Sequence, residues 1–174
     1  MNLMILGVIS DTHDNLINLN KIINEMKKYN VDMLIHLGDF VSPFTLKKIG
    51  EELNNIKIYA VYGNNDGDKL YLKKIANEYK IVLEEQPLIL KIDEHKLFIF
   101  HGYNSSEETV EIAKSIAKSK IYSAVFFGHT HKPYLDFING ILILNPGDAS
   151  GILNRPTFAL IKYPSFSPKI IYME

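Results

Sequence analysis

Five short polar blocks, each placed directly after a run of apolar residues, restrict the fold and chemistry of this chain more than any other feature. Such an apolar run is typical of a buried strand, so each block is expected where a strand ends. The blocks are Asp11-Thr12-His13, Gly38-Asp39, Gly63-Asn64-Asn65-Asp66, His101-Gly102 and Gly128-His129-Thr130-His131. Their carboxylate, amide and imidazole groups are the donors that a pair of divalent metals needs. The pattern therefore predicts a metal centre assembled from several strand ends.

The first half of the chain alternates expected strands with expected helices. The expected strands are Leu3 to Ile9, Val31 to Leu37 and Ile56 to Val61. Asn15 is suited to cap a helix with apolar residues at helical spacing, and Ser42-Pro43 is a typical helix start. The second helix is expected to reach about Leu53, and a third is expected to end near Tyr79. This alternation implies right-handed crossovers and a parallel sheet.

The second half is mostly strands joined by short polar links. The expected strands are Ile81 to Leu83, Leu88 to Ile92, Leu97 to Phe100, Ala124 to Phe127, Tyr134 to Ile138, Ile141 to Leu144, Thr157 to Tyr163 and Lys169 to Met173. Hairpin turns are expected at Asp93 to Lys96 and at Asn139-Gly140. A capping box that begins at Ser105 indicates a helix through about Lys118. We therefore expect an α/β fold with two mixed sheets packed face to face and helices on both outer faces.

Composition sets limits on the architecture and on the partners. The chain has 174 residues, of which 47% are hydrophobic, and it shows no linker or repeat, so we expect one domain over residues 1–174. A net charge of −1 gives no argument for a broad nucleic-acid surface or for a membrane surface. No apolar run approaches the length of a membrane span, and no signal peptide is evident before the first strand. The absence of cysteine excludes disulfides and thiolate ligands, and we expect a cytoplasmic protein.

The seven candidate ligands divide between two metal positions that share one carboxylate. Asp39 is the natural bridging ligand, because a carboxylate has two oxygens. Asp11 and His13 are two residues apart, as are His129 and His131, so each pair is suited to a turn after a strand. We assign one metal to Asp11, His13, Asp39 and His131, and the other to Asp39, Asn64, His101 and His129. Two metals roughly 3.5–4 Å apart hold a bridging hydroxide and clamp a phosphate in line with it.

The five blocks resemble the pattern of the calcineurin-like metallophosphoesterase superfamily. That pattern is Asp-x-His, Gly-Asp, Gly-Asn-His-Asp/Glu, a lone His and Gly-His-x-His, and this chain has the blocks in the same order from Asp11 to His131. The small size suggests the compact bacterial and archaeal phosphodiesterase branch, which lacks cap domains. The resemblance implies a four-layer αββα sandwich, hydrolysis of a phosphodiester substrate, and two divalent metals. Manganese or nickel is the expected metal, with iron, cobalt and zinc as alternatives.

Two positions depart from the family's pattern. Asn65 stands where the family usually has a His that contacts the phosphate and protonates the leaving group. An amide donates a hydrogen bond to a phosphate oxygen but cannot act as an acid, and general acid catalysis typically supplies about 10²–10⁴-fold. Asp148 stands where the compact branch often has Ser, and it is expected either to cap a turn or to bond a histidine that lies behind the ligands. The change at Asn65 argues against substrates with poor leaving groups.

Several other polar residues are candidates for the site, and each also has a simpler structural role as an alternative. Asn65 and Asp66 are the candidate catalytic residues, with a supporting or capping role favoured for Asp66, and Asn65 and Arg155 are the candidate substrate contacts. Tyr103 and Asn104 are candidates to line the pocket. His36 is expected in the core or behind a ligand, and His95 is expected in a solvated hairpin turn.

Three alternatives to a phosphodiesterase follow from the same residues. A phosphomonoesterase or protein phosphatase is disfavoured by the absence of the candidate acid. A non-catalytic scaffold is suggested by Asn65, because a retromer subunit of this fold also lacks the histidine, but here all seven candidate ligands are present. Nuclease activity stays open, although the near-neutral charge offers no broad surface for phosphates. A homo-oligomer also stays open.

Overall fold

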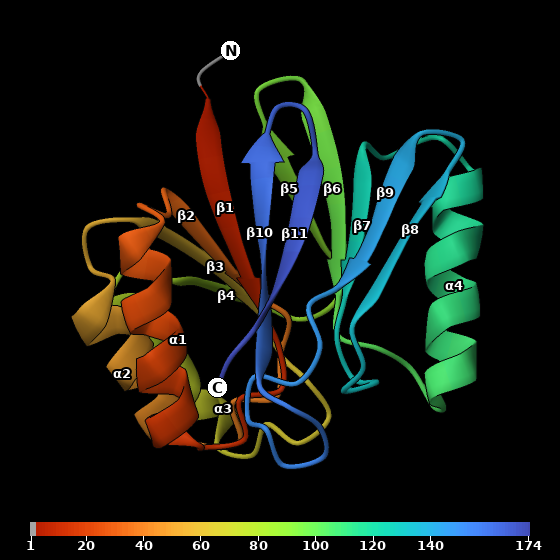
Figure 1. Ribbon diagram of the computed structural model, residues 1–174. Helices are drawn as coiled ribbons and strands as arrows, with labels where there is room; N and C mark the ends of the chain where they lie inside the picture. The colour runs from red at the N-terminus through yellow and green to blue at the C-terminus, as the bar shows by residue number, and fades with distance from the viewer. Residues whose placement is uncertain (1–2) are drawn as a thin grey trace.

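Two β-sheets lie face to face in the computed structural model of the protein, which describes residues 3–174 (Figure 1). The strands are β1 (Met4–Ile9), β2 (Met33–His36), β3 (Lys57–Val61), β4 (Val82–Glu84), β5 (Leu88–Ile92), β6 (His95–Phe100), β7 (Ala124–Phe127), β8 (Tyr134–Ile138), β9 (Ile141–Asn145), β10 (Thr157–Tyr163) and β11 (Ser167–Tyr172). The helices are α1 (Leu16–Lys28), α2 (Pro43–Glu52), α3 (Lys69–Glu78) and α4 (Ser106–Lys118).

Both sheets contain parallel and antiparallel pairs. The first has the order β11-β10-β1-β2-β3-β4, in which β1 to β4 are parallel and β10 runs antiparallel beside β1. The second has the order β5-β6-β7-β9-β8, with parallel pairing from β6 through β7 to β9. The predicted architecture of two mixed sheets is therefore confirmed.

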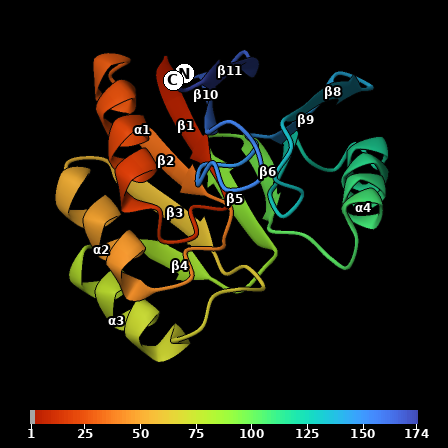
Figure 2. The same ribbon diagram turned by 60° about the horizontal axis from the view of Figure 1, so that its bottom comes forward.

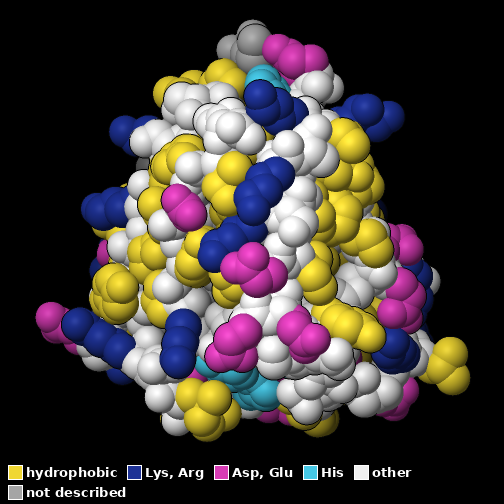
Figure 3. Space-filling model, turned by 90° about the vertical axis from the view of Figure 1, so that its right-hand side faces the viewer, with side chains coloured by type: hydrophobic (Ala, Val, Ile, Leu, Met, Phe, Trp, Pro, Cys, Tyr) yellow, Lys and Arg dark blue, Asp and Glu magenta, His cyan; other side chains and the backbone are white. Residues whose placement is uncertain are grey.

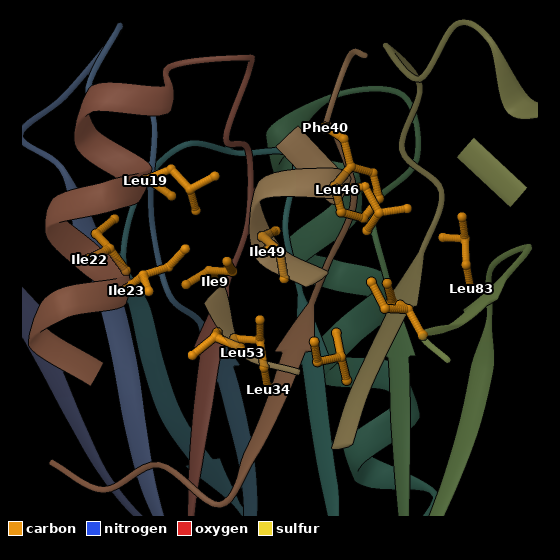
Figure 4. Close-up of a cluster of buried hydrophobic side chains, with 14 of the residues drawn as sticks. Ile9, Leu19, Ile22, Ile23, Leu34, Phe40, Leu46, Ile49, Leu53 and Leu83 are labelled. Atoms are coloured by element: carbon orange, nitrogen blue, oxygen red, sulfur yellow. The ribbon is translucent and has the colours of Figure 1, made fainter. Parts of the chain in front are cut away.

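Three apolar clusters separate four layers. Figure 4 shows part of the first cluster, in which Leu19 and Ile23 of α1 and Ile49 of α2 face Ile9 and Leu34 of the first sheet. The second cluster fills the space between the two sheets, and the third joins the second sheet to α4. Figure 1 shows α1, α2 and α3 beside the first sheet and α4 alone outside the second. Each fully buried aliphatic side chain in these clusters contributes roughly 1.5–3 kcal/mol relative to an exposed one.

The helix starts follow the signals in the sequence. The Asn15 side chain accepts a hydrogen bond from the backbone at Asn18, and Ser42 accepts one from Phe44 directly before Pro43. Ser105 and Glu108 form the predicted capping box of α4. These caps satisfy backbone N–H groups that have no partner inside the helix.

One expected turn is shorter than its sequence suggested. Asp93 and Glu94 form the turn, and His95 is the first residue of β6. The expectation that His95 is solvated is wrong: its ring is partly buried, and its Nδ1 lies 3.0 Å from the Tyr163 hydroxyl. The tyrosine comes from β10, so its approach depends on a contact between sheets.

The carboxyl ends of β1, β2, β3, β6 and β7 lie at the same end of the molecule. Figure 2 turns this end forward and shows the loops that follow these strands crowded together. The first three strands belong to one sheet and the last two to the other, so the loops meet where both sheets end. No helix among residues 3–174 is long and apolar enough to cross a membrane.

Candidate metal centre

Five of the seven predicted ligands have a left-handed backbone. The φ angles are 56° at Asp11, 42° at His13, 60° at Asp39, 69° at His129 and 55° at His131. Positive φ is uncommon outside glycine, and it persists where surrounding contacts hold it in place. Each of these residues turns the chain sharply after a strand, which directs its side chain toward the common centre.

Four ligands form one compact group. Asp11, His13, Asp39 and His131 each offer an atom within 4.8 Å of the others. His13 Nε2 lies 3.4 Å from Asp39 Oδ2, and His131 Nε2 lies 3.4 Å from Asp11 Oδ1. Asp11 Oδ1 and His13 Nε2 are buried and have no hydrogen-bond partner among the described residues. Buried polar atoms without partners are costly, so their convergence here is suited to a bound cation.

A second group forms around Asn64. Its Oδ1 lies 3.0 Å from His101 Nε2 and 2.9 Å from His129 Nδ1. His101 Nε2 also lies 3.4 Å from Asp39 Oδ1, so Asp39 faces both groups, one with each oxygen. The structure thus brings all seven predicted ligands together, with Asp39 at the predicted shared position.

Contacts behind the histidines determine which ring nitrogen faces the centre. His101 Nδ1 donates to the Leu37 carbonyl at 2.7 Å, which leaves Nε2 toward the centre. His129 shows the reverse arrangement, because its Nε2 donates to the Asn104 carbonyl at 2.8 Å and Nδ1 faces Asn64. Outer partners of this kind fix the tautomer and orientation of metal-binding histidines. Asn104, predicted to line the pocket, thus contributes through its backbone.

His131 is backed by a carboxylate instead of a carbonyl. Its Nδ1 lies 3.2 Å from Asp148 Oδ2. Asp148 also accepts hydrogen bonds from Ser150 and from the backbone at Gly151 and Leu153. It therefore organises the turn after β9, as expected, but the histidine that it contacts is a candidate ligand and not one that lies behind the ligands.

His36 connects the first two loops as a neutral group. The backbone N–H of Gly38 donates to its Nδ1 at 3.1 Å, so Nε2 carries the proton and donates to Thr12 Oγ1 at 3.0 Å. Thr12 in turn donates to the Asp39 carbonyl at 3.2 Å. Complete burial lowers the pKa of His36 to about 3. His36 thus lies behind the ligands, as the sequence indicated.

Asn65 contacts the shared carboxylate. Its backbone N–H donates to Asp39 Oδ1 and its side-chain Nδ2 donates to Asp39 Oδ2, both at 2.8 Å. These two hydrogen bonds orient the carboxylate. The sequence suggested a contact with the phosphate, and nothing in the residue type indicated that the amide would turn toward Asp39.

Asp66 ties the second and third loops together. Its oxygens accept hydrogen bonds from the backbone N–H groups of Gly63, Asp39 and Val41 at 2.7, 3.1 and 2.8 Å. Val41 has a φ of 75°, which is unfavourable for a β-branched residue. Asp66 therefore holds this strained loop in place. The helix that follows is capped by Asp68, not by Asp66.

Arg155, the other predicted substrate contact, binds elsewhere in this structure. Its Nε donates to the Met173 carbonyl at 2.6 Å, and its guanidinium lies 5.9 Å from the centre of the Tyr172 ring. A contact with a phosphate would require release of this hydrogen bond. That contact stays a prediction.

The two carboxylates have opposite electrostatic preferences. Burial raises the pKa of Asp11 above its ordinary value, more than the neighbouring histidines lower it. Burial acts in the same direction on Asp39, but close contacts with the His101 and His13 rings outweigh it and hold the pKa well below its usual range. Burial also opposes the charged form of His101, yet contact with Asp39 and the charge of Asp11 raise its pKa. A cation at the centre would favour the charged form of Asp11 and displace protons from the histidines.

Comparison with known proteins identifies the family. The family model of the calcineurin-like phosphoesterase superfamily domain matches residues 4–165. A phosphodiesterase of Methanocaldococcus jannaschii is 38% identical over 162 residues, which cover 91% of this chain and 92% of that protein. The chain belongs to the calcineurin-like phosphoesterase superfamily. The family resemblance of the five blocks is thereby confirmed.

Solved structures agree with the fold of this calcineurin-like phosphoesterase. A structure described as a novel archaeal phosphodiesterase has a TM-score of 0.87 and 34% identity, and the match covers 98% of this chain and 100% of that one. Vps29 of Entamoeba histolytica, solved with zinc, has a TM-score of 0.67 and 19% identity, covering 98% of each chain. The likeness to Vps29 at this identity shows the fold alone.

The donors of this calcineurin-like domain fit two divalent metals. Carboxylate, amide and imidazole donors suit first-row divalent ions, and no thiolate is present. Asp39 offers one oxygen to each group, which is the arrangement that a shared ligand requires. The family and the geometry thus support a divalent metal centre.

Proposed function

We propose that this protein is a phosphodiesterase that depends on two divalent metals. The observation that carries the proposal is the position of Asp39, whose two oxygens face two separate groups of ligands. Asp11, His13 and His131 would complete one metal position with Asp39. Asn64, His101 and His129 would complete the other. Relatives named as phosphodiesterases support the choice of a diester substrate.

The chain's own residues prepare this centre for a phosphate. When bound, the two metals supply an activated hydroxide as nucleophile and neutralise charge on the phosphate oxygens. Asn65 holds the Asp39 carboxylate by two hydrogen bonds, and Asp66 fixes the loops on either side of it. These contacts keep the ligands in place before the substrate arrives, so little reorganisation is needed during the reaction.

The leaving group receives no proton from residue 65. The Asn65 amide is not an acid, and its Nδ2 is already hydrogen-bonded to Asp39. We therefore propose a diester whose leaving group departs without strong acid assistance. Substrates with acidic alcohols, such as phenols, meet this condition. A monoester phosphatase, which would gain from an acid, is the weaker candidate.

The finer assignments are proposals as well. Manganese or nickel suits the mixed oxygen and nitrogen donors, with iron, cobalt and zinc as alternatives. The absence of cysteine is compatible with a cytoplasmic enzyme of one domain over residues 1–174. Arg155 is proposed to contact substrate after its bond to Met173 is released. The state of association is left open.

The test is hydrolysis of bis(p-nitrophenyl) phosphate by metal-loaded wild type and Asp39→Asn. The substitution removes the charge shared by the two positions while keeping the shape of the side chain. We expect metal-dependent hydrolysis by wild type and a loss of roughly 10²-fold or more in the variant, since misplaced reacting groups cost about that much. Equal rates for the two proteins, or no hydrolysis with any metal, would overturn the proposal.

A further inference from the structure

A groove of about 440 Å³ lies between α4 and the segment that follows the last ligand histidine. It is lined by residues that include Val110, Lys114, Thr130, Lys132, Pro133 and Tyr134. Its volume falls within the range of ordinary small-molecule sites. Other cavities lie away from the ligands, such as the one between α1 and β11.

The groove starts beside the metal centre. Thr130 lies in the chain between His129 and His131, and it is buried, with its Oγ1 accepting a hydrogen bond from Asn145 Nδ2 at 3.1 Å. This fixed residue is both a neighbour of two ligands and part of the groove wall. Figure 3 views the molecule from the side of α4 and shows histidine side chains at the lower end of this face. The groove and two of the candidate ligands therefore share the chain segment from His129 to Tyr134.

The floor of the groove is apolar and rigid. Val110 and Tyr134 pack against the third hydrophobic cluster, and the Tyr134 ring lies 5.8 Å from the Phe127 ring. Both residues belong to regular elements, α4 and β8. A floor supported in this way is present before a ligand binds, which lowers the cost of binding.

Polar groups surround this floor. Ser106 and Glu107 lie at the start of α4, and the Lys114 ammonium pairs with Glu111 at 2.8 Å. Lys132 follows the last ligand histidine by one residue and has no ion pair among residues 3–174. The groove thus combines an apolar base with hydroxyl and carboxylate acceptors and an ammonium donor at its edge.

From this arrangement we propose that the groove binds a nucleoside arm of the phosphodiester substrate. A base has a flat apolar body that suits the floor formed by Val110 and Tyr134, and the sugar hydroxyls suit the acceptors at the start of α4. Lys132, which follows His131 directly in the chain, supplies the ammonium donor. The inference rests on the proposed phosphodiesterase function and names a substrate class for that site.

The test compares three p-nitrophenyl phosphodiesters whose second arm is methyl, phenyl or thymidine. The leaving group is the same in all three, so differences in kcat/KM report on the other arm. We expect the thymidine ester to exceed the methyl ester by roughly 10- to 100-fold, the range that contacts in one pocket supply. The phenyl ester should fall between them, because it meets the floor but lacks the polar groups.

Two variants obstruct the groove and one serves as a matched control. Val110→Trp fills the floor, and Glu107→Trp covers the mouth from an exposed position where folding is not at risk. Each should bring the ratio of thymidine to methyl ester close to one. Lys118→Trp places the same side chain at an exposed site on α4 outside the groove, and should keep the wild-type ratio.

The outcomes distinguish failure of the groove assignment from failure of the proposed phosphodiesterase activity. Hydrolysis of all three esters at equal kcat/KM, a phenyl ester equal to the thymidine ester, or an unchanged ratio in both groove variants would each overturn the nucleoside assignment alone. Failure to hydrolyse any of the three with metal present would overturn the phosphodiesterase function, and the groove assignment with it.

Discussion

Replacing Gly63 by Ala should disturb the shared carboxylate without removing any ligand. A Cβ at Gly63 would overlap Asp39 Oδ1 and lie 2.5 Å from the Asp39 backbone N, where ordinary contact begins at 3.4 Å. The Asp39 loop must therefore retreat by about 0.9 Å, the difference between these distances. Overpacking of this kind costs about 1–3 kcal/mol of stability. A displacement near 1 Å at a reacting centre costs about 10²-fold in rate.

The assays are metal binding by calorimetry, hydrolysis of an aryl phosphodiester, and thermal unfolding. Gly67→Ala is the matched control in the same loop, because the nearest atom to its Cβ would be the Val41 carbonyl oxygen at 3.8 Å. The control should keep wild-type activity and change stability by no more than about 1 kcal/mol. If Gly63→Ala binds both metals and turns over substrate as well as Gly67→Ala does, the close approach of the third loop does not determine where Asp39 lies.

Three further predictions follow from the contacts around the centre. Asp148→Asn removes the charge behind His131 and should weaken metal affinity by about 10- to 100-fold in calorimetry. The amide keeps only one of the two acceptor oxygens that hold the turn after β9, so thermal unfolding is measured in parallel. Asn65→His introduces an acid and should raise turnover of alkyl diesters relative to aryl diesters, by up to about 10²-fold. If parallel assays show an unchanged ratio of alkyl to aryl turnover, the role given to residue 65 is wrong. Metal affinity should fall as pH decreases toward the ordinary histidine pKa of about 6.5 and below. His101 and His131 have raised pKa values in the metal-free protein, so metal must displace their protons. Metal titrations at several pH values measure this, and an affinity that does not change with pH would contradict the reasoning.

Local signals in the sequence predicted most elements and the seven candidate ligands that the structure brings together. The Asn15 and Ser42 caps and the apolar runs of β1 and β7 depend on neighbouring residues, which a sequence displays directly. The five blocks were detectable because ligand types and glycines recur at strand ends. The pairing of β10 with β1 was not predictable in this way, since it joins segments about 150 residues apart.

Side-chain directions around the ligands also required the structure. Asn65 turns toward Asp39, and Arg155 toward the Met173 carbonyl, although either residue type commonly binds phosphate. The choice of ring nitrogen at His129 depends on the Asn104 carbonyl, a backbone atom with no signature in the sequence. The partial burial of His95 was not predictable, because its partner, Tyr163, comes from the other sheet. These features arise from contacts between distant segments.

The candidate ligands come from both sheets, so a bound metal would also have a mechanical role. Asp11, Asp39 and Asn64 follow strands of one sheet, whereas His101 and His131 follow strands of the other. A metal held by residues from both would cross-link the two halves of the sandwich at one end, and its binding free energy would add to the stability of the native state. Chelators should then lower the unfolding temperature. They should also increase hydrogen exchange at the carboxyl ends of β3 and β6, so that both sheets loosen at this end together.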